Sequence, residues 1–111
     1  MSITIGNYRD AQRHDPSTRV FKCSRGSAVG NPFPMKNESM RDIVCDNYEN
    51  WFKSQIVAND NGSADDPHFG GYVLEMVNAA REGDIKLMCW CAPKRCHCET
   101  IKAYLEEKID A

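Results

Sequence analysis

Three segments of the chain have the hydrophobic pattern of β-strands. Residues 2–6 and 18–24 each carry apolar side chains among polar ones, which is typical of half-buried strands. Residues 85–91 form an apolar run that only Lys86 interrupts. The length and content of this run predict a central strand that is covered on both faces.

Three further segments carry apolar residues at helical spacing. The longest begins near Ser39, where Ser39 and Asp42 have the arrangement of a capping box. The other two helices are predicted from about residue 72 to 81 and from about residue 98 to 109. The apolar stripe of the longest helix consists of Val44, Tyr48, Trp51, Phe52 and Ile56.

The order of these elements predicts an α/β fold. Strands followed by helices, with the most apolar strand late in the chain, are typical of a three-layer sandwich with a small, largely parallel sheet. Two polar segments, residues 25–37 and 59–71, are predicted to be long loops. The sequence shows no internal repeat and no linker, so we expect a single domain over residues 1–111.

Charge and hydropathy argue against several classes of function. The 111 residues carry a formal net charge of −2, whereas nucleic-acid binding by bulk electrostatics needs clustered Lys and Arg. The apolar runs are too short to cross a bilayer, and the N-terminus lacks the pattern of a signal peptide. We therefore expect a cytoplasmic protein with no membrane partner, and nucleic acid is not a favoured partner.

The six cysteines are distributed unevenly. Four of them fall within ten residues, at Cys89, Cys91, Cys96 and Cys98. In a reducing compartment such a cluster indicates metal binding, catalysis or packing rather than disulfides. Cys23 and Cys45 stand alone in apolar surroundings, and we expect both to be small buried hydrophobic residues.

Three interpretations of the cysteine-rich segment are open. The thiols could pack as small apolar side chains where the last strand leads into the last helix. They could hold zinc in a site drawn from Cys89, Cys91, Cys96, His97 and Cys98, with the first four as the leading set of ligands, since these residue types suit a tetrahedral site. Alternatively, Cys96 or His97 is catalytic or faces an anionic substrate, because the N-terminus of the following helix favours anions and lowers the pKa of a thiol.

A second candidate segment is the glycine-rich loop from Arg25 to Phe33. It follows a predicted strand, and its glycines, Gly26 and Gly30, would let the backbone approach a phosphate or a sugar. Arg41 lies in the first turn of the longest helix, where positive charge is unfavourable, and this placement suggests an anionic ligand. Arg25, Gly30, Asn31 and Arg41 are therefore the candidate ligand-binding residues.

These motifs resemble the family DUF4326, a domain of unknown function found in bacteria and their phages. The resemblance extends from about residue 18 to the C-terminus. It rests on Arg25, the Gly30-Asn31-Pro32-Phe33 turn, Arg41, Tyr48, Cys89-Trp90-Cys91, Pro93 and Cys96-His97. Two positions depart from the family pattern: Cys98 stands where a glycine is usual, and Val29 where a tryptophan is common.

The resemblance implies that the two loops form one site and that a small protein of this kind is phage-encoded, but it supplies no activity. We expect a pocket between residues 25–33 and 91–97 that binds a nucleotide-like or other anionic small molecule, with any chemistry at Cys96 or His97. The alternative is a non-enzymatic factor that acts on a host protein, with a structural or zinc-holding cluster. The sequence does not decide whether the protein is an enzyme.

Overall fold

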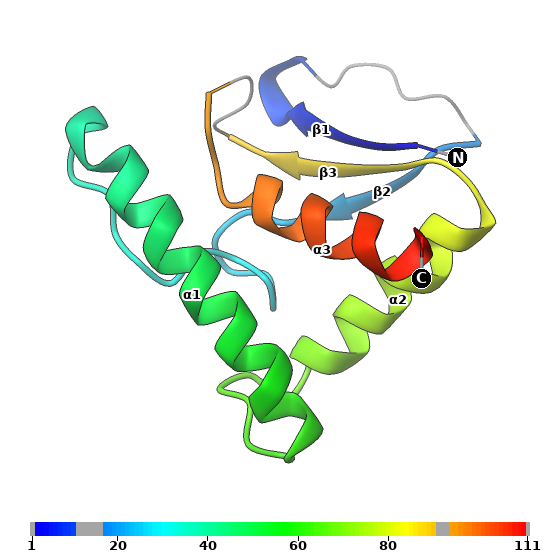
Figure 1. Cartoon of the computed structure of the whole chain (residues 1–111). Helices are drawn as coiled ribbons and strands as arrows, with labels where there is room; N and C mark the ends of the chain where they lie inside the picture. The colour runs from blue at the N-terminus through cyan, green and yellow to red at the C-terminus, as the bar shows by residue number, and fades with distance from the viewer. Residues whose placement is uncertain (1, 11–16, 91–93, 111) are drawn as a thin grey trace.

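A three-stranded parallel sheet forms one side of the molecule, and the helices lie beside it (Figure 1). The computed structural model describes residues 2–10, 17–90 and 94–110. The strands are β1 (Ile3–Asn7), β2 (Arg19–Lys22) and β3 (Ile85–Cys89), and two short 3₁₀ helices are η1 (Tyr8–Asp10) and η2 (Glu38–Met40). The α-helices are α1 (Arg41–Asp60), α2 (Phe69–Glu82) and α3 (Cys98–Asp110).

The strand order is β1-β3-β2, and β3 pairs in parallel with both neighbours. Ile3 and Arg19 are both in register with Ile85, so all three strands start at the same edge and end at the same edge. Ile85 and Leu87 are fully buried, as expected for a central strand. These features confirm the predicted α/β class and the small parallel sheet.

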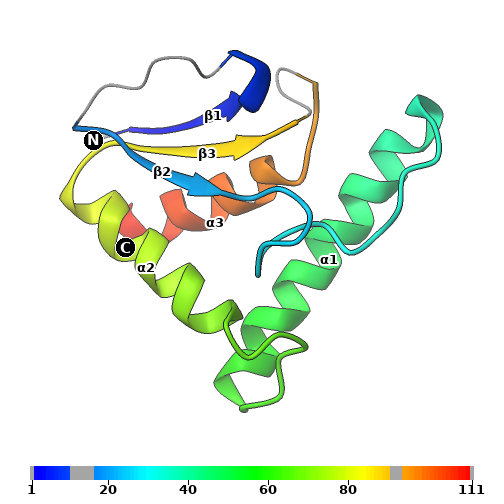
Figure 2. The ribbon, with the colours of Figure 1, turned by 180° about the vertical axis from the view of Figure 1, so that it is seen from behind.

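The helices lie together in one layer on one side of the sheet, whereas the sequence suggested a three-layer arrangement with helices on both faces (Figure 2). Strand alternation directs Leu87 and Cys89 toward this side, where α3 packs against β1 and β3, and α2 packs against α3. Phe21 of β2 also faces the helices and meets the ring of Tyr72 in α2 edge-on at 6.0 Å. Phe21, Leu87 and Cys89 therefore belong to one hydrophobic core, which positions the carboxyl ends of β2 and β3.

Side chains cover the carboxyl-terminal part of the opposite face. A side chain at Gly6 would meet Lys86 and Met88, so these three residues share that face. The rings of Tyr8 and Trp90 are 4.6 Å apart, and strand alternation places them on the same side as Met88, which is buried. In the described part of the chain, aromatic rings rather than a helix thus shield this end of the sheet.

The predicted apolar stripe of the longest helix is present in α1. Tyr48 and Phe52 are buried completely or nearly so, Val44 is buried, and Trp51 and Ile56 pack against the core while partly exposed. Aromatic contacts extend from Phe52 to α2 and α3, because its ring lies 5.5 Å from Phe69 and 5.4 Å from Tyr104. The stripe therefore joins all three helices.

The predicted capping box at the start of α1 is wrong. The N-cap residue is Asn37 rather than Ser39, and it caps the short helix η2. The side-chain oxygen of Asn37 accepts the N–H of Ser39 at 3.1 Å. The hydroxyl of Ser39 also bonds that oxygen. The short helix η2 directly precedes α1, so the capping residue lies before η2 rather than directly before α1.

The boundaries of two other elements differ from the prediction. Helix α2 begins at Phe69, three residues earlier than expected, because Phe69 is buried and Asp66 accepts the N–H of His68 at 2.8 Å. Gly70 belongs to the helix, where it lies directly against Asn59 of α1. Strand β3 ends at Cys89, and Cys91 lies outside the described residues.

Candidate functional site

A pocket of about 170 Å³ lies at the carboxyl ends of β2 and β3, which is the edge where parallel α/β sheets usually bind ligands. The segment after β2, the segment after β3 and the first turns of α1 all contribute to it. Its lining residues are Ser24, Arg25, Asn31, Met35, Arg41, Val44, Cys45, Trp90, Cys96 and His97. The structure thus brings together five of the residues singled out from the sequence: Arg25, Asn31, Arg41, Cys96 and His97.

The loop after β2 is held by its own hydrogen bonds. The Arg25 guanidinium donates to the Asn31 carbonyl at 2.6 Å, and the Asn31 side chain accepts the N–H of Phe33 at 2.8 Å. Gly30 lies inside this turn rather than in the pocket wall, and a side chain there would lie 2.6 Å from the carbonyl oxygen of Ser24. The role of Gly30 is therefore to let the loop close, which leaves Arg25 and Asn31 facing the pocket.

Arg41 reaches the pocket wall, but its guanidinium already has anionic and polar partners. It donates to both carboxylate oxygens of Glu38, at 2.9 and 2.7 Å, and to the carbonyl of Arg95 at 2.8 Å. Hydrogen bonds from Arg41 and Lys94 lower the pKa of Glu38 to about 2, so this carboxylate is charged at neutral pH. Arg41 therefore joins η2 to the segment before α3.

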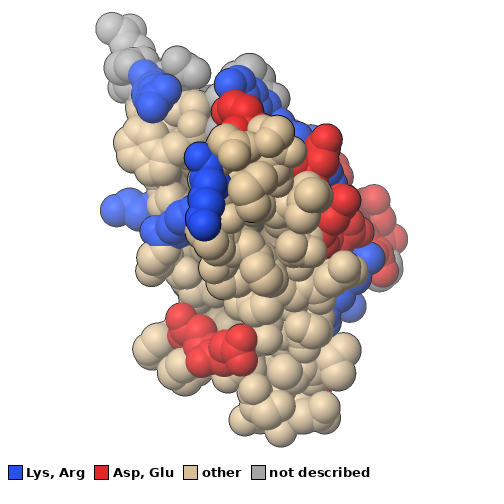
Figure 3. Space-filling model, turned by 90° about the vertical axis from the view of Figure 1, so that its left-hand side faces the viewer, with Lys and Arg blue, Asp and Glu red and all other residues tan. Residues whose placement is uncertain are grey.

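Lys94 and Arg95 point away from the thiols, toward carboxylates. Lys94 pairs with Glu38 at 3.3 Å, and Arg95 pairs with Asp42 at 3.0 Å and with Asp46 at 2.7 Å. Basic side chains gather on one side of this end of the molecule and acidic ones on the other (Figure 3). These ion pairs fix the segment before α3 against α1.

The N-terminus of α3 is capped by a carboxylate of its own first turn. Glu99 accepts the N–H of Cys96 at 3.0 Å, while the Cys96 carbonyl accepts the N–H of Glu99 at 3.1 Å. An acidic side chain at this position satisfies an N–H group and matches the helix dipole. Because Glu99 occupies this place, the helix terminus itself is a poor site for a second anion.

The expected lowering of the pKa of Cys96 is wrong. Its pKa is raised to about 12, first because its thiol is hydrogen-bonded with that of Cys89, and further because it is buried. The thiol is therefore protonated at neutral pH, and a protonated thiol is a weak nucleophile.

His97 is buried between the two loops. Its Nε2 bonds the carbonyl of Cys23, which must be the acceptor, so Nε2 carries the proton and Nδ1 holds the lone pair. The ring meets that of Tyr48 edge-on, with centroids 5.0 Å apart. Burial lowers the pKa of His97, so the imidazole is neutral at pH 7 and offers hydrogen bonding rather than charge.

Three thiols converge behind the pocket wall. The sulfur atoms of Cys89, Cys96 and Cys98 all lie within 4.8 Å of one another, and those of Cys89 and Cys96 are 3.3 Å apart. Hydrogen bonds with the neighbouring thiols, that of Cys23 first, raise the pKa of Cys98. All five cysteines that the structure describes are reduced and buried.

This group differs from the zinc ligands proposed from the sequence. Cys89 and Cys96 are shared by both sets, whereas Cys91 lies outside the described residues. His97 uses Nε2 on the Cys23 carbonyl, and it does not belong to the group of converging ligands. Cys98 takes part instead, because the first turn of α3 directs its sulfur toward the end of β3.

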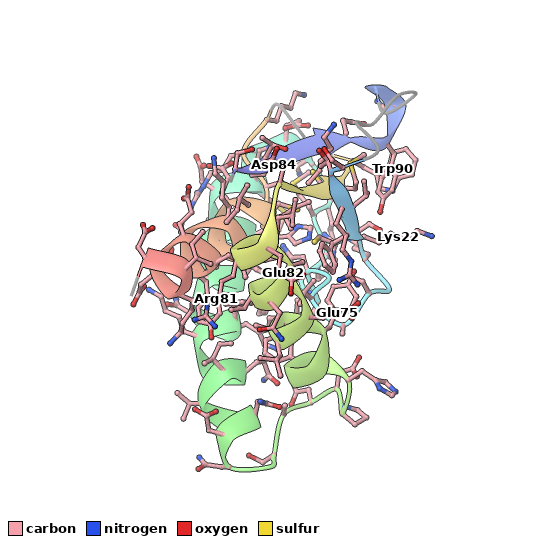
Figure 4. All side chains as sticks on the ribbon, turned by 90° about the vertical axis from the view of Figure 1, so that its right-hand side faces the viewer. Lys22, Glu75, Arg81, Glu82, Asp84 and Trp90 are labelled. Atoms are coloured by element: carbon pink, nitrogen blue, oxygen red, sulfur yellow. The ribbon has the colours of Figure 1, made fainter. Side chains whose placement is uncertain are left out.

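Trp90 is one of the pocket residues that sequence reasoning did not select as a ligand. It is 56% exposed, directly follows β3, and points outward on the same side of the molecule as Lys22 (Figure 4). Its ring is supported by Tyr8, whose hydroxyl lies 3.4 Å from that of Ser24. An exposed, supported indole at the edge of a pocket is suited to stacking against a flat ring.

The fold and the pocket define a small α/β domain with a candidate ligand site at the carboxyl edge of its parallel sheet. The chain belongs to the family DUF4326, "Domain of unknown function (DUF4326)", whose model matches residues 6–107. The match confirms the resemblance predicted from the motifs and extends it toward the N-terminus as far as Gly6, near the end of β1. Searches of curated proteins and of solved structures found no match.

Among the residues described, none of the helices combines the length and the apolar character needed to cross a bilayer.

Proposed function

We propose that the protein binds a small anionic, nucleotide-like molecule in the pocket between the loops that follow β2 and β3. The observation that carries this proposal is the pocket itself, which Arg25, Asn31, His97 and Trp90 line together. Few polar groups converging in a mostly apolar cavity are typical of small-molecule sites.

The size of the cavity limits the part of the ligand that enters it. A cavity of roughly 150 Å³ is enough to bind one benzene ring. The 170 Å³ available here would therefore accept one ring or one sugar, and the rest of a nucleotide would lie at the mouth. Trp90 at the edge would stack with a base that remains outside.

Arg25 is the proposed partner of the anionic group. It is exposed, and its described hydrogen bond to the Asn31 carbonyl engages one of the three guanidinium nitrogens. A guanidinium offers five N–H donors in a planar arrangement that suits phosphate or carboxylate oxygens. Arg41 is assigned a positioning role, because Glu38 and the Arg95 carbonyl already bind its guanidinium.

The proposal is one of binding rather than of covalent catalysis. A thiol with a pKa of about 12, as in Cys96, supplies almost no thiolate at pH 7. His97 is neutral and retains an acceptor nitrogen, which suits a hydrogen bond from a sugar hydroxyl.

Replacing Arg25 by glutamine is expected to weaken binding of adenosine 5′-monophosphate or ribose 5-phosphate by about 10-fold or more. A hydrogen bond to a charged group contributes about 1.5–3 kcal/mol, and 1.4 kcal/mol is a factor of ten in the dissociation constant. Isothermal titration calorimetry measures the constant, with inorganic phosphate as a third probe for the anionic group alone.

The matched control is Lys36→Gln, which removes one positive charge from the same connecting segment at an exposed position outside the pocket. Its effect on binding is expected to be less than about 3-fold, because exposed charges at a distance are screened by salt. Equal losses in the two variants, or no binding of any of the three probes, would rule out the proposed site.

A further inference from the structure

The thiols behind the pocket suggest a second site, which goes beyond the proposed function. We propose that Cys89, Cys96 and Cys98 together bind one thiophilic d¹⁰ cation, with Zn²⁺ as the expected ion. The three sulfur atoms come from the last residue of β3, the segment before α3 and the first residue of α3. Sulfur-only ligands select zinc-like ions against magnesium and calcium, which prefer oxygen.

The distances among the three sulfurs are close to those of a bound ion. Zinc–sulfur bonds of about 2.3 Å at tetrahedral angles place sulfur atoms roughly 3.8 Å apart. Here Cys89 and Cys96 are 3.3 Å apart, and no pair in the group exceeds 4.8 Å. Rotamer adjustments of a few tenths of an ångström to about one ångström would therefore be enough to form the site.

Rigid elements hold the ligands in place. Cys89 is the partner of Asn7 in the parallel pairing of β1 with β3, so its backbone is fixed by the sheet. Cys98 begins α3, whose Ile101 and Leu105 are fully buried in the core. The backbone of Cys96 is fixed by its two hydrogen bonds with Glu99. Preorganised ligands of this kind lower the cost of assembling a metal site.

Binding requires each thiol to lose its proton to solvent, after which three thiolates donate electron pairs to the ion. A tetrahedral Zn²⁺ with three protein ligands keeps a fourth position for water or for another ligand. Cys96 belongs both to the thiol group and to the pocket wall. An ion bound to the Cys96 sulfur would therefore be next to the pocket, separated from it only by the Cys96 side chain.

Apolar packing alone explains the arrangement of the three thiols less well than a metal site does. Buried cysteines are common as small apolar residues, and Cys45 is an example in this chain. Convergence of three sulfur atoms from a strand, a loop and a helix is a geometry that a metal ion requires and that apolar packing does not.

The test is a titration of the full chain with Zn²⁺ in the presence of a phosphine reductant, followed by the same titration with Co²⁺. We expect one ion per chain and the near-ultraviolet thiolate-to-cobalt absorption of a sulfur site. Cys89→Ala and Cys98→Ala should each weaken Zn²⁺ binding by more than about 100-fold, since loss of even an outer partner costs 10–100-fold. Cys45→Ala is the control, a buried cysteine in the pocket wall outside the thiol group.

A measurement on the unmodified chain decides the matter even if a variant fails to fold. Zn²⁺ should slow alkylation of Cys89, Cys96 and Cys98 by at least about 10-fold, as located by mass spectrometry, while Cys45 is unaffected. Absence of stoichiometric Zn²⁺ binding, or equal protection of Cys45, would overturn the metal site. Because Arg25→Gln leaves all three ligands intact, it should retain Zn²⁺ binding, and this separates failure of the metal site from failure of the anion pocket.

Discussion

Replacing Phe52 by alanine is expected to lower the free energy of unfolding by about 3–5 kcal/mol, which is typical for truncating a buried aromatic side chain. Phe52 is 1% exposed, and its ring meets those of Tyr48, Phe69 and Tyr104 at centroid distances of 5.4–5.9 Å. These contacts join α1 to α2 and α3. Urea denaturation followed by far-ultraviolet circular dichroism measures the loss.

Val57 provides the comparison for this change. It lies on the same helix but is 61% exposed, so Val57→Ala should alter the unfolding free energy by no more than about 0.5 kcal/mol. A loss below about 1 kcal/mol for Phe52→Ala would show that this ring does not hold the three helices together.

The sequence was a good guide to those elements whose hydrophobic pattern matches their burial. The alternating strands, the central apolar strand and the stripe from Val44 to Ile56 were all found where expected. Each of these segments packs against the core, so the spacing of its apolar residues can be seen directly in the sequence. The class of fold follows from their order along the chain.

Element boundaries were less predictable because contacts distant in sequence determine them. Gly70 looks like a loop residue, yet it lies in α2 where Asn59 of α1 leaves no room for a larger side chain. Asn37 displaces Ser39 as the cap because η2 adds one turn before α1. The local pattern contains no information about the contact with Asn59, whereas the cap is a local contact for which Asn37 and Ser39 were both available in the sequence.

For the candidate site, position was easier to predict than chemistry. Two loops that follow adjacent parallel strands must meet at one edge of the sheet, and Arg25, Asn31, Cys96 and His97 do line one pocket. The pKa of Cys96 was predicted with the wrong sign, because the hydrogen bond with Cys89 and burial outweigh the helix terminus. Whether any of these residues binds a ligand stays a prediction.

The ion pairs that Arg95 forms could not be predicted from local sequence. Its partners Asp42 and Asp46 come close only in the fold, whereas Glu38, the partner of Arg41, lies three residues before it in the chain. The place of Trp90 at the pocket edge likewise depends on where β3 ends.

Substitution of Gly30 by alanine is expected to destabilise the protein by about 1–3 kcal/mol, as for other overpacked sites. The added methyl carbon would lie 2.6 Å from the carbonyl oxygen of Ser24 and 2.9 Å from the Cα of Arg25. Both of these are backbone atoms, so the loop has to move rather than a flexible side chain. Urea denaturation gives the change in stability.

The same substitution should also weaken binding of adenosine 5′-monophosphate, because the methyl group would separate the ends of the loop at which Arg25 bonds the Asn31 carbonyl. Gly83→Ala is the matched control: its backbone is extended, and a methyl group there would have no atom within 4 Å. That variant should keep both the affinity and the stability within about 0.5 kcal/mol of the original chain. Equal effects of the two substitutions would mean that close packing of the turn at Gly30 is not what positions Arg25 in the pocket.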